Sequence, residues 1–157
     1  MFQLFKAKPH TFIAPMCGVM KPLEEVADPV FSSKSMGDGF AVALEEGQVV
    51  SPVDGEIMAI FPTKHAIGIL GKDGYEYLLH IGLDTVYLQG EGFDLKVQSG
   101  DQVKPGDLLL EVDLELLRSK QIDLTSPVIV TNLDGRKVKL LKQGPVSLKE
   151  AELIQII

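Results

Sequence analysis

The chain has 157 residues, of which 45% are hydrophobic and 24% are charged, the balance of an ordinary globular protein. This length fits one domain that buries about two-thirds of its unfolded surface. The net charge of -7 argues against a nucleic-acid partner held by phosphate contacts, and the single cysteine, Cys17, excludes an internal disulfide. No apolar run approaches the roughly 20 residues of a membrane span. We therefore expect a cytoplasmic protein.

Two segments near the start of the chain share one pattern. We expect residues 1–12 to be a short tail, in which His10 has no role, and residues 13–157 to form a single domain. FIAPMCGVMKPL (12–23) and VVSPVDGEIMAI (49–60) each place Pro, two residues and Gly after an apolar pair. A weaker echo at residues 124–133 has Pro127 but no following Gly. This pattern predicts an internal duplication of a strand–turn–strand unit.

Short apolar strands recur at close spacing, separated by Gly-Asp, Asp-Gly and Pro-Gly turns. This punctuation predicts an antiparallel all-β sandwich or barrel. The expected strands are Gly39–Leu44, Gln48–Ser51, Glu56–Phe61, Ala66–Leu70, Tyr75–Ile81, Leu108–Val112, Val128–Thr131 and Val138–Leu141. One helix is expected at Leu114–Gln121, capped by Asp113, and a second short turn at Leu23–Val26.

The segment VQSGDQVKPGDLLLEVD, residues 97–113, repeats Val, two or three residues and then Gly-Asp. This arrangement resembles the barrel-like sandwich shared by lipoyl and biotinyl carriers and several relatives. It indicates a fold and says nothing about function. The expected fold is thus an all-β, antiparallel, barrel-like sandwich with one or two short helices.

Two histidines flank a tight turn. His65 lies in FPTKHAIGIL and His80 in YLLHIGL, and only GKDG at residues 71–74 separates the two strands, which indicates a β-hairpin. If the turn is centred between residues 72 and 73, paired numbers sum to 145 and the two rings lie directly opposite each other. A turn centred on residues 73 and 74 makes them diagonal neighbours, and a three-residue loop with a Gly bulge sends them to opposite faces. Thr63, two residues before His65, shares its face.

A histidine pair at the end of a hairpin supports three kinds of chemistry. One histidine can be a nucleophile that carries a covalent group, while the other donates a hydrogen bond to that group. Both can bind zinc, with Asp28 or Asp84 as a third ligand. They can also simply pack together. The spacing alone leaves all three open.

At this point most of the chain resembles a known family. LLHIGLDTVYLQGEGF, with T-x-H upstream, closely resembles the phosphorylation-site segment of the glucose-family enzyme IIA domains of the bacterial phosphoenolpyruvate:sugar phosphotransferase system. The resemblance runs from about Ile13 to the end in the family's order. It includes IAPMCG, DPVF followed by GDGFAV, SPVDGEI, FPTKHA, GDQVKPGD and TSPV.

The resemblance implies a phosphohistidine relay. His80 matches the family's phosphoryl acceptor, which is modified on Nε2 by the phosphocarrier HPr and passes the group to a cysteine on the IIB domain of a sugar permease. His65 and Thr63 match the second active-site histidine and the threonine that assists the pair. The carbonyl of Gly82 is expected to hold Nδ1–H of His80, so that Nε2 keeps the free lone pair. Such a protein is a phosphotransferase component, and the resemblance implies no cofactor.

The resemblance also implies a docking surface around the histidines. Two acidic residues beside the family's site are matched by Asp28 and Asp84. The family's apolar rim for partner proteins is matched by Val30, Phe31, Phe61 and Val86. An apolar rim ringed by charge suits a transient docking site, and we expect a monomer.

Two other functions stand as alternatives. A zinc-dependent hydrolase on a related sandwich calls for a His-x-His pair with an upstream His and Asp, and the chain has no close His-x-His. A lipoyl or biotinyl carrier would modify Lys64 in PTKHA. A lysine-bearing hairpin of that kind is expected to stand alone, without a companion histidine site at residue 80.

Overall fold

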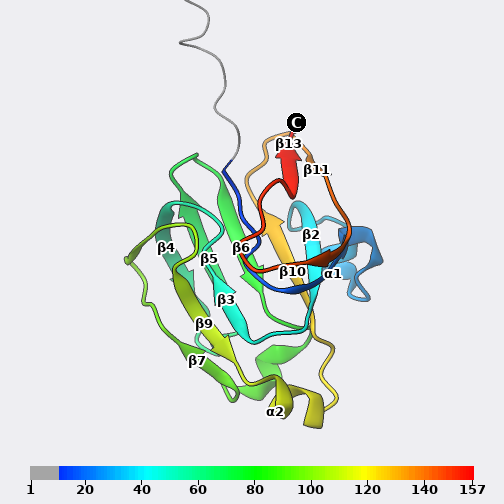
Figure 1. Ribbon diagram of the computed structural model, residues 1–157, viewed down its shortest axis with the longest axis vertical. Helices are drawn as coiled ribbons and strands as arrows, with labels where there is room; N and C mark the ends of the chain where they lie inside the picture. The colour runs from blue at the N-terminus through cyan, green and yellow to red at the C-terminus, as the bar shows by residue number, and fades with distance from the viewer. Residues whose placement is uncertain (1–10) are drawn as a thin grey trace, which may run out of the picture.

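The structure, a computed structural model, describes residues 11–157 and is built almost entirely from antiparallel strands (Figure 1). The strands are β1 (Gly18–Pro22), β2 (Asp38–Leu44), β3 (Gln48–Val50), β4 (Gly55–Ile60), β5 (Ala66–Gly71), β6 (Glu76–His80), β7 (Phe93–Leu95), β8 (Gln102–Val103), β9 (Leu108–Val112), β10 (Thr125–Val130), β11 (Val138–Leu140), β12 (Gly144–Val146) and β13 (Ile154–Ile156). The helical segments are η2 (Leu23–Glu25), α1 (Pro29–Ser32), η3 (Thr85–Leu88) and α2 (Leu114–Ser119).

Three sheets make up the sandwich. The largest has the order β12-β1-β2-β10-β6-β5-β4-β8, the second has the order β3-β9-β7, and the third joins β11 to β13. In Figure 1 the second sheet crosses in front of β4 and β5, and α2 lies at the end of the molecule opposite the C-terminus. The all-β expectation, with one or two short helices, is confirmed.

All eight expected strands are present, and β10 begins three residues earlier than expected, at Thr125. The expected helix at Leu114 is also present, and Asp113 caps it by accepting a hydrogen bond from Leu116 N at 3.1 Å. The helical segments α1 and η3 and the short strands β7, β8, β12 and β13 were not expected from the sequence. Strands of two or three residues carry no apolar alternation long enough to be read.

The two segments with the shared Pro-x-x-Gly pattern pair with each other. Ile13 N donates to Pro52 O at 3.0 Å, and Val50 N donates to Pro15 O at 2.9 Å. In each segment the residue two positions before the proline therefore donates to the carbonyl of the other segment's proline. This reciprocal pairing is expected for two copies of one unit related by a local two-fold axis. The glycine of each pattern then opens a long strand, Gly18 in β1 and Gly55 in β4. The expected tail lies outside the described residues up to residue 10.

Two apolar cores flank the large sheet. The main core lies between the sheets and includes Leu79 of β6. A smaller cluster lies on the other face and contains Leu23, Val26, Phe31, Ala41, Ala66, Leu78, Leu83 and Ile129. Because side chains alternate along a strand, Leu78 and His80 share this second face. The segments η2 and α1 contribute Leu23 and Phe31 to this face, next to the end of β6.

Within residues 11–157, no helix combines the length and the apolar character that crossing a membrane requires.

Candidate active site

The hairpin that carries His80 has a different register from the one that would align the two histidines. Ala66 pairs with His80, so paired numbers sum to 146. Gly71 N donates to Tyr75 O at 2.9 Å, which leaves a three-residue loop, and Gly74 in that loop has φ 89. This is the three-residue loop with a glycine bulge, the register expected to send the two rings to opposite faces.

The two rings nevertheless meet, because His65 lies just outside the strand. β5 begins at Ala66, and Lys64 has the left-handed φ of 62. This turn releases the His65 side chain from the alternation of the pleat, although its carbonyl still accepts a hydrogen bond from Ile81 N at 2.8 Å. The ring centroids of His65 and His80 are 5.0 Å apart, with the planes at 79°. The pair therefore forms through a loop, not through cross-strand pairing.

The His80 ring is held in a single tautomer. Its Nδ1 lies 2.8 Å from Gly82 O, and since a carbonyl only accepts, Nδ1 must carry the proton. Gly82 has the left-handed φ of 68, and its N–H donates to Ser126 Oγ at 2.9 Å. Ser126 Oγ in turn donates to Leu124 O at 3.0 Å. This chain of bonds fixes the acceptor and leaves Nε2 of His80 with its lone pair.

His65 is oriented by its own neighbours. The Thr63 hydroxyl lies 2.6 Å from His65 Nδ1, and the Phe61 ring packs edge-on at 5.5 Å between centroids. His65 is only 4% exposed. When the hydroxyl donates to Nδ1, Nε2 of His65 carries the proton and can donate it to an anion.

Both rings are neutral at neutral pH. Burial, and to a lesser extent His65, lower the pKa of His80 from 6.5 to about 4, against the opposing effects of the Gly82 carbonyl, Asp28 and Asp84. Burial also lowers the pKa of His65. A neutral His80 with its proton on Nδ1 is nucleophilic at Nε2.

The rings open into a pocket of about 240 Å³. All six residues expected around the histidines line it: Asp28, Val30, Phe31, Phe61, Asp84 and Val86. Three further lining residues, Met36, Leu78 and Thr85, were not singled out from the sequence. Thr63 and Gly82 do not line the pocket, but they are hydrogen-bonded to the rings of His65 and His80, respectively.

Most of the expected rim is exposed, but Phe31 is not. Val30 is 49% exposed, Phe61 41% and Val86 44%, whereas Phe31 is 4% exposed. The Phe31 ring lies 4.9 Å from the His80 ring between centroids. Phe31 therefore forms a wall behind the nucleophile, and it cannot offer a partner much surface.

The two carboxylates are placed by local structure. Asp28 caps α1, because its carboxylate accepts a hydrogen bond from Val30 N at 3.0 Å. Pro29 follows at the first position of the helix, where its missing N–H costs nothing. Asp84 precedes η3 with the left-handed φ of 57 and makes no capping bond. Within the described part of the chain, no three His, Cys, Asp or Glu side chains are grouped to hold a metal ion.

A fixed neutral imidazole beside a second imidazole that can donate a proton to an anion is the site of a histidine-based group-transfer protein. Residues 10–135 match the family described as the phosphoenolpyruvate-dependent sugar phosphotransferase system, EIIA 1, and the chain belongs to this family. It is a phosphoryl carrier, a transferase component of a sugar phosphotransferase system.

Relatives and a solved structure agree with this assignment. The chain is 52% identical over 130 residues to a "PTS system glucose-specific EIIA component" of Bacillus cereus, covering 83% of this chain and 79% of that protein. It is 50% identical over 141 residues to a "PTS system beta-glucoside-specific EIIBCA component" of Bacillus subtilis, covering 89% of this chain and 23% of that protein. The solved glucose permease IIA from Mycoplasma capricolum superposes with a TM-score of 0.86, at 41% identity and 96% coverage of both chains. None of these matches supports a zinc hydrolase or a lipoyl carrier.

The lowered pKa of His80 predicts a pH-dependent stability. Between pH 6.5 and about 4, residue 80 of the unfolded chain binds a proton that the folded chain does not. The free energy of unfolding should therefore fall as the pH falls through this window, by up to about 1.4 kcal/mol per pH unit from this residue. Urea unfolding should show a shallower pH slope for His80→Gln, and NMR should show His80 titrating near pH 4 in the folded wild type. Titration at its ordinary value would contradict this account.

Replacing Gly82 should disturb the tautomer. An added Cβ would lie 2.8 Å from Thr85 Cγ2 and 3.0 Å from Asp123 O, at a left-handed backbone position. Gly82→Ala should therefore displace the acceptor and let His80 populate both tautomers, as read from its ¹⁵N shifts. Gly100→Ala is the matched control, since Gly100 has φ +93 with nothing within 4 Å; it incurs only the backbone strain of about 1–2 kcal/mol. An unchanged tautomer in Gly82→Ala would show that the carbonyl does not set it.

Proposed function

We propose that His80 carries the phosphoryl group on Nε2, taking it from the phosphohistidine of HPr and giving it to a cysteine on a IIB domain. One observation carries this assignment: the hydrogen bond of 2.8 Å between Nδ1 and Gly82 O, which makes Nε2 the only nucleophilic nitrogen of the ring. The same ring faces a pocket that a partner's phosphohistidine can enter.

Acceptance requires no proton transfer at His80. The Nε2 lone pair forms a bond to phosphorus, and the bond from phosphorus to the donor's nitrogen breaks, returning its electron pair to the donor. With Nδ1–H in place, the phosphorylated ring is cationic. The Gly82 carbonyl, Asp28 and Asp84 favour that cation, because they are the groups that raise the pKa of His80 against the effect of burial. The carboxylates thus have a role in a site that handles phosphate.

Delivery reverses the same bonds. A cysteine thiolate of the IIB domain attacks phosphorus, and the electron pair of the breaking bond returns to Nε2. Positioning and charge stabilisation are what phosphoryl transfer needs from the protein. His65 supplies both, since its Nε2–H can donate to a phosphoryl oxygen while Thr63 holds its Nδ1 at 2.6 Å.

Partners dock on the rim around this pocket. Val30, Phe61 and Val86 are each between 41% and 49% exposed and line the same cavity as the two carboxylates. Tyr87 follows Val86 and is 82% exposed, which adds an aromatic residue of the kind enriched in interfaces. Apolar contacts supply binding energy, and Asp28 and Asp84 attract a basic partner.

The relatives indicate the setting. The Bacillus subtilis relative is named as a component with B, C and A parts, so an A unit like this chain works beside a B unit. Relatives specific for glucose and for β-glucosides both match, and we propose glucose because the solved relative with near-complete coverage is a glucose permease IIA. We further propose that residues 13–157 act as one cytoplasmic, monomeric domain.

Phosphorylation from labelled phosphoenolpyruvate, with enzyme I and HPr, tests the relay. The wild type should gain one acid-labile phosphate, and His80→Ala should gain none. His65→Ala should still accept phosphate but pass it to a IIB domain at least about tenfold more slowly, the size of one charge-assisted hydrogen bond. His10→Ala, which removes the chain's third histidine, is the matched control and should behave as wild type. Phosphate that survives His80→Ala would overturn the assignment.

The docking rim predicts a second effect on rate. Val86→Lys places a cation where a basic partner docks and removes apolar contact, so single-turnover transfer from phospho-HPr should slow by about tenfold or more. Val19→Lys is the control, because Val19 is 39% exposed and lies in β1, outside the pocket. Both variants should keep the wild-type circular dichroism spectrum. Equal slowing by both would show that the effect is one of net charge.

A further inference from the structure

The peptide group between Ile81 and Gly82 is hydrogen-bonded at both of its ends. Its N–H, on Gly82, donates to Ser126 Oγ at 2.9 Å. Its carbonyl, on Ile81, accepts a hydrogen bond of 2.5 Å from the Thr85 hydroxyl. Among the hydrogen bonds of residues 11–157, this is the one that Ile81 O accepts. Because a peptide group is planar, bonds at both ends fix the orientation of the whole plane.

The next peptide group, between Gly82 and Leu83, holds the His80 ring. Its carbonyl accepts a hydrogen bond from His80 Nδ1 at 2.8 Å, and its N–H donates to Asp123 O at 3.0 Å. The two peptide planes meet at the Cα atom of Gly82, where a glycine allows more rotation than any other residue. The Gly82 carbonyl therefore stays in line with Nδ1 only while the preceding plane is held as well.

Both branches of the Thr85 side chain act on this one point. The hydroxyl holds the Ile81 carbonyl, and the methyl group packs against Gly82, since a Cβ built on Gly82 would lie 2.8 Å from Thr85 Cγ2. Thr85 and Ile81 have no exposed surface, so the carbonyl is shielded from water. A β-branched side chain is also stiff at χ1, which keeps the hydroxyl and the methyl group in place together.

Thr85 lies at the base of the histidine pocket, between two residues that are expected to meet a partner. Asp84 and Val86 flank it in the chain, and all three line the pocket. The helical segment η3 begins at Thr85, and Asp84 makes no capping bond to it. The hydrogen bond from Thr85 to Ile81 therefore ties this docking segment to the loop that sets the tautomer of His80.

We propose that Thr85 is a positioning residue for phosphoryl transfer. By holding the Ile81 carbonyl, its hydroxyl keeps the Gly82 carbonyl on Nδ1 of His80, and Nε2 therefore remains the nucleophile. Thr85 acts through two peptide groups, and its own bonds do not change during transfer. This inference rests on the proposed role of His80 as the phosphoryl acceptor.

Two variants separate the hydroxyl of Thr85 from its methyl group. Thr85→Val keeps the shape but leaves the Ile81 carbonyl without its donor, whereas Thr85→Ser keeps the hydroxyl. In ¹H–¹⁵N spectra of the unphosphorylated protein, Thr85→Val should show both tautomers of His80, and Thr85→Ser should show the wild-type tautomer. Single-turnover transfer from phospho-HPr should slow by about tenfold or more in Thr85→Val, as expected for the loss of one buried hydrogen bond. The rate should recover in Thr85→Ser.

Ser51→Ala is the matched control for a purely structural effect. Ser51 has no exposed surface and donates to Val53 O at 2.7 Å, and it does not line the histidine pocket. Ser51→Ala removes a buried hydroxyl-to-carbonyl bond of the same kind, so the urea midpoint should fall as it does in Thr85→Val. The tautomer of His80 and the transfer rate should stay at their wild-type values. Slower transfer in Ser51→Ala would show that stability sets the rate, and the proposal would be wrong.

The wild type offers a test that needs no variant. The hydroxyl proton of Thr85 should exchange slowly with water and be visible by NMR, and rapid exchange would overturn the proposal even if Thr85→Val did not fold. A single wild-type tautomer in Thr85→Val, or no recovery in Thr85→Ser, would overturn it as well. The proposed function fails by a different result, which is phosphate that survives His80→Ala. That result would leave the tautomer measurements unaffected, because they are made without phosphate.

Discussion

The hydrogen bond from His80 Nδ1 to Gly82 O is the constraint on which the rest of the site depends. Without it, the proton of a neutral imidazole divides between two nitrogens, and the nucleophile is not defined. The bond exists because β6 ends at His80 and Gly82 then turns its carbonyl back with a left-handed φ. Ser126, in strand β10, holds that turn in place by accepting a hydrogen bond from Gly82 N. The local hydrogen bond between His80 and Gly82 thus depends on Ser126, which lies 44 residues after Gly82 in the chain.

The electrostatics around His80 are balanced between two charge states. Burial and His65 disfavour a cationic ring, whereas the Gly82 carbonyl, Asp28 and Asp84 favour one. Burial dominates, so the ring is neutral and ready to attack. In the proposed phosphorylated state, with phosphorus on Nε2, the ring is cationic and the same carboxylates favour it. On this proposal, a site without them would hold a good nucleophile but a less stable phosphohistidine.

The sequence predicted the architecture better than the way in which the site forms. Turn residues located the strands, and the cap at Asp113 was readable because capping is local. The hairpin register was not readable, since turns that differ by one residue all fit GKDG. The approach of His65 to His80 depends on the left-handed conformation of Lys64, which no residue preference predicts for a lysine. The roles of the site residues rest on the family resemblance and stay predictions, while the buried position of Phe31 differs from its expected place on an exposed rim.

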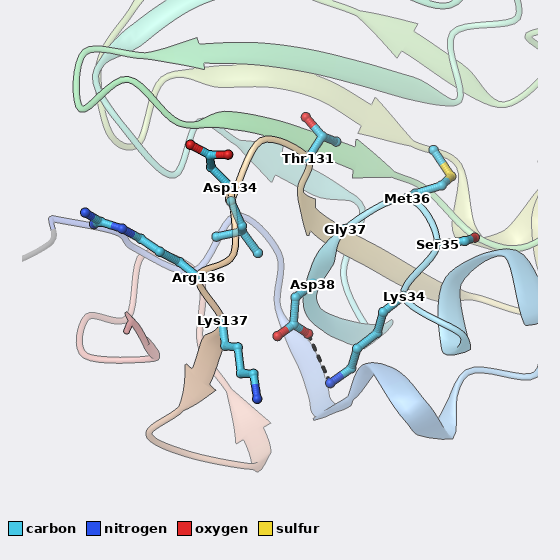
Figure 2. A pocket seen from close by; sticks show the side chains of 10 residues that line it. Lys34, Ser35, Met36, Gly37, Asp38, Thr131, Asp134, Arg136 and Lys137 are labelled. Carbon is cyan, nitrogen blue, oxygen red and sulfur yellow. Dashed lines mark ion pairs between the residues drawn. The ribbon is translucent and has the colours of Figure 1, made fainter.

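Among residues 11–157, the histidine pocket is lined by two carboxylates and by no lysine or arginine. Asp28 and Asp84 are these carboxylates, whereas the neighbouring cavity between residues 34–38 and 131–137, which shares Met36, mixes both signs of charge (Figure 2). The two carboxylates disfavour a free phosphate ion in the histidine pocket, because like charges repel. In the proposed relay, a phosphoryl group therefore reaches His80 on a partner whose own cations offset the carboxylates.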